Sequence, residues 1–451
     1  MTTLAQALEA PDDIIELDLR GAQLSELPPA IGRLCNLRLL DLRENQLTEL
    51  PPELGELRQL AVLRLEQNLL EDLPDAIGGL PQLKALWLGQ NRFTRVPPAL
   101  CKLTSLEFLG LDHNDLEELP PEIGQLHRLR YLHLENNRLE RLPETICRLG
   151  ALEQLQLSHN RLSGLPTPLC LLPRLCKLGL EHNQIVELKL ANGALPALAE
   201  LYLSGNPLEQ LPEQIETLAC LELLALYRTR VREMPPGMAR LTRLKSLGLG
   251  YTPLAALPSA VWDVPSLEWL DLRDTGLRQL PEEIGQLHRL RHLDLRDNLL
   301  TDLPEALLRM TQLERLDLWG NELDQQLLAC LSERLPDTDL RTVDWLTLYS
   351  RMLRDIAGLR ATTGANDAEI AQAVRGLMRD EPLPEPFVDR PELLATLRTL
   401  AWLLFTRAPQ LSDSAPVTSA MLVDLVRTGE YSWFDVLEHL LCMERAAGAV
   451  D

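Results

Sequence analysis

The chain has 451 residues, of which 45% are hydrophobic, and it carries a net charge of −22 at pH 7. Nucleic acids and anionic membranes select clustered lysine and arginine, so this charge argues against both and leaves a protein as the expected partner. No signal-peptide pattern opens the chain, no apolar run is long enough for membrane insertion, and the eight cysteines lack paired spacing, so we expect a cytoplasmic protein.

A short capping helix is the first element expected, within residues 1–11. Thr2 or the threonine after it can begin this helix, because a threonine side chain accepts a hydrogen bond from the first free backbone amides. Leu4 and Ala7 then fall on one face at helical spacing. That face is expected to cover the first unit of the repeats that follow.

Residues 12–323 follow a strict 23-residue period. Fourteen units succeed one another without insertion, which predicts a solenoid in which each unit stacks on its neighbours. One position in each period, here called the ladder position, is almost always asparagine or threonine. It holds Ala22, Asn45, Asn68, Asn91, Asn114, Asn137, Asn160, Asn183, Asn206, Thr229, Thr252, Thr275, Asn298 and Asn321.

Each unit reads L-x-x-L-x-L-x-x-N-x-L-x-x-L-P-x-x-I-G-x-L, as residues 37–57 illustrate with small changes. The L-x-L segment alternates with a period of two, which predicts a short strand whose leucines point into the core. The proline predicts a short helix or 3₁₀ turn, because proline fits the first turn of a helix. Gly55 and its equivalents are expected where that turn ends.

The asparagine of the ladder position is expected to satisfy buried backbone groups. Its side-chain amide has two donors and an acceptor, so it can bridge its own turn and the next one. Thr229, Thr252 and Thr275 can perform part of this task through one hydroxyl group each. We interpret these threonines as variation within the repeat, with a functional hinge as the alternative.

This pattern resembles the leucine-rich repeat family, in its intracellular 23-residue class, which includes signalling scaffolds and many bacterial proteins. The resemblance implies an α/β solenoid with a curved parallel sheet on the concave face and short helices or 3₁₀ turns on the convex face. It also implies that proteins bind to the concave face. In that fold, the concave side chains lie six, four, two and one positions before the ladder position and one position after it.

Aromatic side chains and histidines gather at those concave positions. Eight of the ten aromatic residues in the repeats take them, although Phe93 is expected in the core. Exposed rings and arginines are typical of binding interfaces, because they bury a large area at a low entropic cost. Rings stacked merely to shield the sheet backbone are the alternative. The proposed partner-binding residues are Trp87, Phe108, Tyr131, His133, His159, His182, Tyr202, Tyr227, Arg228, Arg230, Tyr251, Trp269 and Trp319.

The first candidate for a binding hot spot combines Tyr227 and Tyr251 with Arg228 and Arg230. The two arginines make the one locally positive spot expected on the concave face. Counted over all fourteen units, the concave positions carry 16 acidic and 12 basic residues. Most of the net charge therefore lies elsewhere, which favours a role in solubility and weakens the expectation of a basic partner.

His159 and His182 are expected side by side on adjacent strands, roughly 5 Å apart. Together with Glu181 they could be imagined as a zinc site. No cysteine joins them, however, and a repeat produces such columns of like residues freely. We therefore expect a polar, pH-sensitive contact patch and neither a metal ion nor a cofactor.

Residues 324–451 lose the period and predict a helical cap followed by a small all-α domain. Leucines 327, 328, 331 and 335 fall on one helical face, which suits a cap over the last repeat. This segment holds eight of the 18 aromatic residues, enough for a core of its own. Apolar spacing and proline breaks predict further helices at about 340–358, 368–380, 391–406, 417–428 and 433–447.

No catalytic residues are predicted, because nucleotide-binding, kinase and serine-hydrolase motifs are missing from the sequence. We therefore expect a non-enzymatic interaction or scaffold protein. The alternative is an enzyme whose repeats select a substrate for a catalytic C-terminal domain, as in bacterial effector ubiquitin ligases. Those enzymes use a Cys-x-Asp motif, which neither Cys330 nor Cys442 matches. Only five lysines among 44 basic residues indicate a GC-rich bacterial genome. The partner's identity and the oligomeric state stay open.

Overall fold

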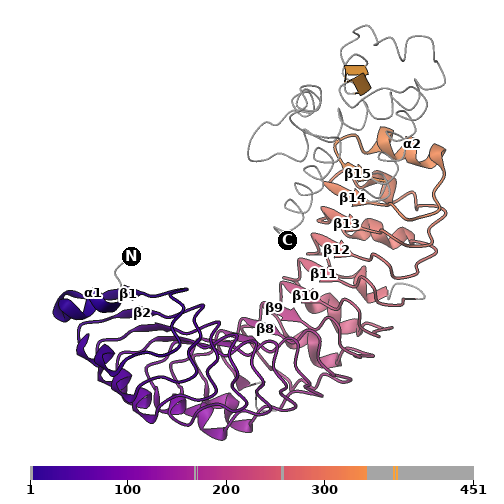
Figure 1. Cartoon of the computed structure of the whole chain (residues 1–451). Coiled ribbons are helices and arrows are strands. Elements are labelled where there is room, and N and C mark those ends of the chain that lie inside the picture. Colours follow the sequence, from indigo (N-terminus) through magenta and orange to yellow (C-terminus); the bar gives the residue numbers. More distant parts are fainter. Residues whose placement is uncertain are drawn as a thin grey trace. The chain divides into compact units, whose positions relative to one another are not determined.

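The computed structural model describes residues 4–166, 169, 171–254, 259–342, 369–370 and 372–373. The chain divides into two compact units, Met1–Thr342 and Val343–Asp451. The first unit holds a single curved parallel sheet whose strands follow the order of the sequence (Figure 1). The all-α domain predicted after it lies outside the described residues, apart from short helical pieces at 369–370 and 372–373.

The sheet has fifteen short strands among the described residues, and each strand pairs in parallel with the next one along the chain. The first fourteen begin 23 residues apart, so equivalent leucines such as Leu40 and Leu63 face each other across the sheet. The strands are Glu16–Asp18 (β1), Leu39–Asp41 (β2), Val62–Arg64 (β3), Ala85–Trp87 (β4), Phe108–Gly110 (β5), Tyr131–His133 (β6), Gln154–Gln156 (β7), Lys177–Gly179 (β8), Glu200–Tyr202 (β9), Leu223–Ala225 (β10), Ser246–Gly248 (β11), Trp269–Asp271 (β12), His292–Asp294 (β13), Arg315–Asp317 (β14) and Asp339–Arg341 (β15).

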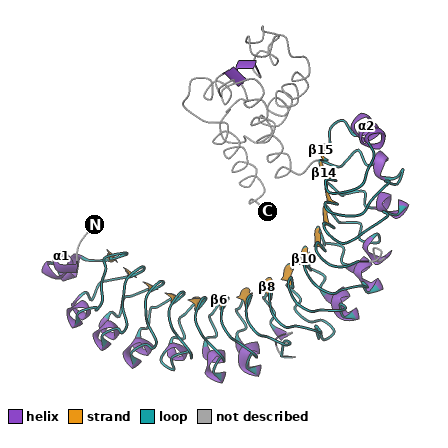
Figure 2. Cartoon of the chain, turned by 45° about the vertical axis from the view of Figure 1, so that its right-hand side comes forward, coloured by secondary structure: helices purple, strands orange, loops and turns teal. Residues whose placement is uncertain are grey.

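Short 3₁₀ helices cover the convex side of this sheet, as Figure 2 shows in purple. Most begin directly after a proline whose backbone is extended, such as Pro51 with φ −71° and ψ 144°. The predicted turn after the L-P pair is thus confirmed. These helices are Pro11–Asp13, Pro29–Arg33, Pro52–Glu56, Asp75–Gly79, Leu100–Lys102, Pro121–Gln125, Glu144–Arg148, Glu213–Thr217, Pro236–Arg240, Ser259–Val261, Glu282–Gln286 and Leu307–Arg309.

The glycine that several units carry in the convex turn lies one residue earlier than predicted. Gly55 lies inside the 3₁₀ helix Pro52–Glu56 and does not end it. A Cβ atom on Gly55 would lie 2.6 Å from the backbone carbonyl oxygen of Ala76 in the next unit. The glycine therefore permits close contact between successive convex turns, which a side chain would prevent.

Leucines from the sheet and the convex turns fill the space between these two layers. Leu54, Leu63 and Leu86 are fully buried, as is Phe93, the ring predicted to point inward. Replacement of one such leucine by alanine typically destabilises a protein by about 2–5 kcal/mol. The hydrophobic core is therefore continuous along the solenoid and has no single centre.

The ladder asparagines bond to buried backbone groups, but toward the preceding turn and not the next one. The Nδ2 atom of Asn68 donates to the Leu65 carbonyl of its own turn at 3.1 Å and to the Leu42 carbonyl of the preceding turn at 2.9 Å. Its Oδ1 atom accepts from the Leu47 amide at 3.1 Å. The amide lies on the side of its turn where these groups of the preceding turn have no other backbone partner.

The ladder threonines supply part of the same bonding, as predicted. Thr229 donates its hydroxyl proton to the carbonyl of Leu226 in its own turn at 2.9 Å. Thr252 donates to the same carbonyl from the following turn, also at 2.9 Å. Each hydroxyl has one proton to donate, so each threonine serves one of the two carbonyls that an asparagine serves at once.

Two helices close the ends of this unit. Helix α1, Leu4–Glu9, buries Ala7 against the first repeat, as predicted. Helix α2, Gln325–Arg334, begins at Asp324, whose side chain accepts from the Leu327 amide at 2.7 Å, and the leucines at 331 and 335 are buried.

The fifteenth strand was not predicted from the sequence, which indicated a helix from about residue 340. Strand β15 instead pairs with β14, so that Leu340 lies opposite Leu316. An edge strand presents a row of unpaired backbone groups, and β15 satisfies those of β14. The local apolar spacing gave no sign of this distant pairing.

Candidate partner-binding surface

The concave face presents every residue that the sequence assigned to partner binding. Five of the thirteen are exposed, namely His159, His182, Arg228, Arg230 and Tyr251, and the other eight are half-buried. The half-buried ones are Trp87, Phe108, Tyr131, His133, Tyr202, Tyr227, Trp269 and Trp319. The ladder therefore sorts side chains correctly between core and surface, although it does not show which surface residues meet.

Rings on strands β4, β5 and β6 form one cluster. Trp87 and Phe108 stack with their centroids 3.7 Å apart, and Phe108 meets the edge of His133 at 5.0 Å. Tyr131 lies 6.4 Å from Phe108. Burial lowers the pKa of His133, so its imidazole is neutral at pH 7.

The two histidines predicted side by side do stack, with their ring centroids 4.3 Å apart and the planes 15° from parallel. Burial lowers the pKa of His159, and the neighbouring charge of His182 lowers it further. Stacked rings do not converge on one point, as ligands of a metal ion must. Within the part of the chain that the structure describes, no three histidine, cysteine or acidic side chains gather into a possible metal site.

The residue directly before the ladder position takes a left-handed backbone conformation in all fourteen units. Glycine occupies this position at Gly21, Gly205 and Gly320, with φ of 65°, 70° and 75°. Arg228 and Tyr251 adopt φ of 55° and 60° there. A non-glycine residue pays roughly 1 kcal/mol for this conformation. Since every unit adopts it, the conformation belongs to the repeat and does not mark a site.

Of the four residues proposed as a hot spot, Tyr227, Arg228 and Tyr251 lie in one cluster, in which Arg273 contacts both tyrosine rings. The guanidinium of Arg228 lies 5.0 Å from the centre of the Tyr251 ring. That of Arg273 lies 5.4 Å from the Tyr227 ring and 5.5 Å from the Tyr251 ring. Arg230 is exposed and is not among the described cations that lie over these rings.

Two glycines make room for this cluster. The ring of Tyr227 lies so close to Gly248 and Gly250 that a Cβ atom on either residue would crowd it. Burial in this bed, together with the charge of Asp271, raises the pKa of the Tyr227 hydroxyl. Both glycines occupy concave positions beside Tyr227, so the sequence contains a sign of this packing. The sequence does not show the direction in which the ring turns, however, and the packing depends on that direction.

Aspartate and arginine pairs neutralise each other toward both ends of the concave face. Asp41 and Arg43 lie 2.6 Å apart, and Asp271 and Arg273 lie 3.0 Å apart. Asp271 is almost fully buried, and its pKa is raised by that burial and by the nearby charge of Asp294. Each aspartate also accepts a hydrogen bond from the backbone amide two residues later. It therefore stabilises the turn in addition to binding the arginine side chain.

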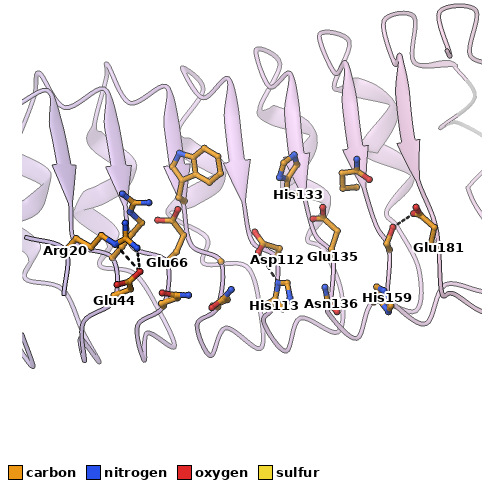
Figure 3. A pocket seen from close by; sticks show the side chains of 17 residues that line it. Arg20, Glu44, Glu66, Asp112, His113, His133, Glu135, Asn136, His159 and Glu181 are labelled. Atoms are coloured by element: carbon orange, nitrogen blue, oxygen red, sulfur yellow. Dashed lines mark hydrogen bonds and ion pairs between the residues drawn. The ribbon is translucent and has the colours of Figure 1, made fainter. Parts of the chain in front are cut away.

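A groove of about 680 Å³ follows the concave face along the ends of strands β1 to β8 (Figure 3). Five carboxylates line it, and four of them, those of Glu66, Asp112, Glu135 and Glu181, lie two places before a ladder position. Burial raises the pKa of both Glu66 and Glu135. In each of these two side chains, the Oε2 atom is buried without a hydrogen-bond partner. The sequence had placed three of these acids beside the histidines and had not singled out Glu66.

Of the two cysteines weighed for an enzymatic role, one lies in the described part of the chain. Cys330 is half-buried on α2, as a free thiol. Cys442 lies outside the described residues. The catalytic alternative therefore gains no observation from the described part of the chain.

Comparison with known proteins places these features in a family. A family model described as leucine-rich repeat region matches residues 16–119 and 237–344. A second model, described as leucine rich repeat, matches residues 104–162 and 127–185. No curated protein matches the chain. None of the described helices is long and apolar enough to cross a membrane.

Solved structures agree with the family models. A leucine-rich repeat protein of Leptospira interrogans is 31% identical, with a TM-score of 0.63, and the match covers 75% of this chain and 98% of that one. The plant peptide hormone receptor RGFR1 in complex with RGF2 is 29% identical (TM-score 0.57), over 69% of this chain and about half, 52%, of the receptor. An internalin of Listeria monocytogenes shares the fold at 21% identity (TM-score 0.56), over 75% and 89%. The chain belongs to the leucine-rich repeat family.

Proposed function

We propose that this chain is a non-enzymatic interaction protein that binds a protein partner on the concave face of its sheet. The observation that carries the proposal is the cluster of Tyr227, Arg228, Tyr251 and Arg273. Its side chains are held in place by contacts with one another and by the glycines beneath Tyr227. Side chains ordered before binding lose less entropy when a partner arrives, which favours affinity.

The comparisons support a binding role for the concave face. The plant receptor that resembles this chain was solved in complex with RGF2. The similarity to the Leptospira protein, which spans nearly the whole of that chain, supports a bacterial origin. We place the protein in the cytoplasm as a scaffold, a proposal that the free thiols of the six described cysteines support, because reducing compartments keep thiols free.

Site-specific photocrosslinking in the cells that make the protein tests this proposal. A photoreactive residue replaces Ser204, which precedes Tyr227 by one strand on the concave face, or Arg148, which is exposed on the convex face. Protein crosslinks are expected from position 204 and not from position 148. Tyr227→Ala combined with Arg228→Ala should reduce the crosslinks from position 204 at least tenfold, since hot-spot side chains each contribute about 2 kcal/mol or more.

Equal crosslinking from the two faces would contradict the proposal. Full crosslinking by the double variant would remove the hot spot from it. The thermal unfolding midpoint of the double variant serves as the control for folding. We expect only a small decrease, because Arg228 is exposed and the half-buried Tyr227 lies outside the leucine core.

A further inference from the structure

Charge is segregated along the concave face, although the total over the face is small. The residue two places before the ladder position is arginine toward both ends, as at Arg43 and Arg296, and each pairs with an aspartate of its own strand. In the middle of the face the same position holds acids, small residues and Tyr227. The acids are Glu66, Asp112, Glu135 and Glu181, all of which line the groove.

Within the described residues, no lysine or arginine forms an ion pair with any of these four acids. The groove lining contains two arginines, but Arg20 pairs with Glu44 and Arg43 pairs with Asp41 at 2.6 Å. Among the described residues, ion pairs with the four acids reduce to one, between Asp112 and His113 at 3.1 Å. The imidazoles of His133 and His159 are neutral at pH 7, so they add no positive charge.

Two of the four acids each have one carboxylate oxygen that is buried and makes no hydrogen bond. The Oε2 atoms of Glu66 and Glu135 have no hydrogen-bond partner, whereas Glu181 accepts from the Ser158 hydroxyl. A buried acceptor left without a partner costs about 1–3 kcal/mol, and more when it is charged. Both carboxylates belong to half-buried side chains that line the groove, so a ligand with positive charge bound there would offset this cost.

An aromatic surface completes the groove. Trp87 lines it and stacks on Phe108. Cations of the chain lie over Tyr131, Tyr202, Tyr227, Tyr251 and Trp319, but within the described residues none lies over Trp87. Trp is the most favourable ring for a cation, and a guanidinium can stack on a ring while it donates to carboxylates.

We propose that the groove binds an extended, arginine-bearing segment of the protein partner. This inference rests on the proposed function and adds the chemistry of the ligand. Arginine fits better than lysine, because its planar guanidinium can bond a carboxylate with two donors and lie flat on Trp87. The middle of the concave face thus selects positive charge, while the hot spot near Tyr227 supplies the apolar and aromatic contact.

The distance between the acids of the groove sets the distance expected between the arginines of the partner segment. Glu66 and Asp112 are two strands apart, as are Glu135 and Glu181, which corresponds to roughly 10 Å at the usual strand separation. In a polyproline II segment, residues i and i+3 point to the same side and lie roughly 9 Å apart. A segment with arginine at every third position therefore matches the groove.

Fluorescence anisotropy with a labelled peptide of three Gly-Arg-Pro repeats tests this inference on the full chain. The control peptide has citrulline, a neutral analogue of similar shape, in place of each arginine. The test variant is Glu66→Gln with Glu135→Gln. Its matched control is Glu117→Gln with Glu140→Gln, which removes the same charge from two exposed glutamates outside the groove.

The arginine peptide is expected to bind the wild-type protein at least tenfold more tightly than the citrulline peptide. The groove variant should lose about tenfold in affinity for each carboxylate removed, since hydrogen bonds to charged groups contribute about 1.5–3 kcal/mol. The affinity of the control variant for the peptide should stay within about twofold of the wild type, because dissolved ions screen the attraction between exposed charges. The groove variant should unfold at no lower temperature than the wild type.

Equal losses in the two variants, or equal binding of the two peptides, would overturn the inference. The Tyr227→Ala and Arg228→Ala variant separates it from the proposed function, since it should keep the peptide and lose the partner. Absent peptide binding with intact crosslinks at position 204 would reject the arginine ligand alone. Crosslinks that appear equally from position 148 would reject the proposed function whatever the peptide does.

Discussion

Single residues in this protein divide between structural and exposed roles according to their place in the repeat. The ladder asparagine Asn68 uses its amide on buried backbone groups of two turns, so it has nothing to offer a ligand. Two positions earlier, Glu66 leaves a buried oxygen unbonded. A side chain that satisfies the fold and one that strains it thus lie two residues apart.

Glu135 provides a prediction at this scale. Burial raises its pKa in the folded protein above the unfolded value near 4.5. The carboxylate therefore destabilises the fold at pH 7. As pH falls through the folded pKa, the folded state takes up a proton before the unfolded state does, and this destabilisation disappears. Glu135→Gln should accordingly be more stable than the wild type at pH 7, by about 1 kcal/mol, the usual cost of an unbonded buried acceptor.

Urea unfolding at a series of pH values measures this difference. The advantage of the Glu135→Gln variant should shrink as the pH is lowered toward 4 and vanish below it. Glu140→Gln, at an exposed site, should match the wild type throughout. A variant of Glu135 that is less stable at pH 7 would mean that its carboxylate has a structural partner.

Each repeat as an element couples a strand to a convex turn, and the contact between successive turns depends on glycine. Gly55 lies against the Ala76 carbonyl, whereas Gly150 has nothing within 4 Å of the place where a Cβ atom would be. The two glycines look alike in the sequence, each near the end of a convex turn. Their surroundings differ because Gly55 lies inside its 3₁₀ helix and Gly150 follows one.

These glycines give a matched pair of substitutions. Gly55→Ala should destabilise the protein by about 1–3 kcal/mol, because the added methyl group must push two turns apart. Gly150→Ala should leave stability unchanged or raise it by up to about 1 kcal/mol, since alanine restricts the unfolded chain. Chemical denaturation compares the two variants, and equal effects would show that close packing of the convex turns is unimportant.

At the scale of the whole stack of repeats, the two ends of the stack decide whether it is stable. Helix α1 covers the first repeat, while α2 and β15 cover the last one. The leucines at 331 and 335 bury themselves in the core of the last repeat, and β15 pairs with the outer edge of β14. A solenoid needs such caps because its core is open at both ends.

Truncation tests the C-terminal cap. A fragment of residues 1–342 should keep the stability of the repeats, because it retains α2 and β15. A fragment of residues 1–322 should be less stable by roughly 3–6 kcal/mol, from two buried leucines alone. It should also self-associate, since β14 becomes an open edge. Urea unfolding and size-exclusion chromatography measure both effects, and identical behaviour of the two fragments would show that the cap is dispensable.

The sequence predicted the concave surface well and its internal contacts poorly. The 23-residue period placed Tyr227, Arg228 and Tyr251 on one face, because strand alternation fixes which side chains point outward. It chose Arg230 as their neighbour, whereas the structure brings in Arg273 from two strands away. Neighbours in a sheet depend on how far each side chain leans, and a period carries no information on that.

The sequence by itself determined the repeat, the parallel order of the strands and the sorting of side chains between core and surface, because each follows from spacing along the chain. Only the tertiary structure decided which charges are neutralised. The concave face contains nearly balanced charges in the sequence. Arginines nevertheless pair with aspartates toward its ends, and in the described part of the chain no ion pair forms with Glu66 or Glu135. The reason is physical: electrostatic energy depends on distance and burial, and both are set by the folded sheet.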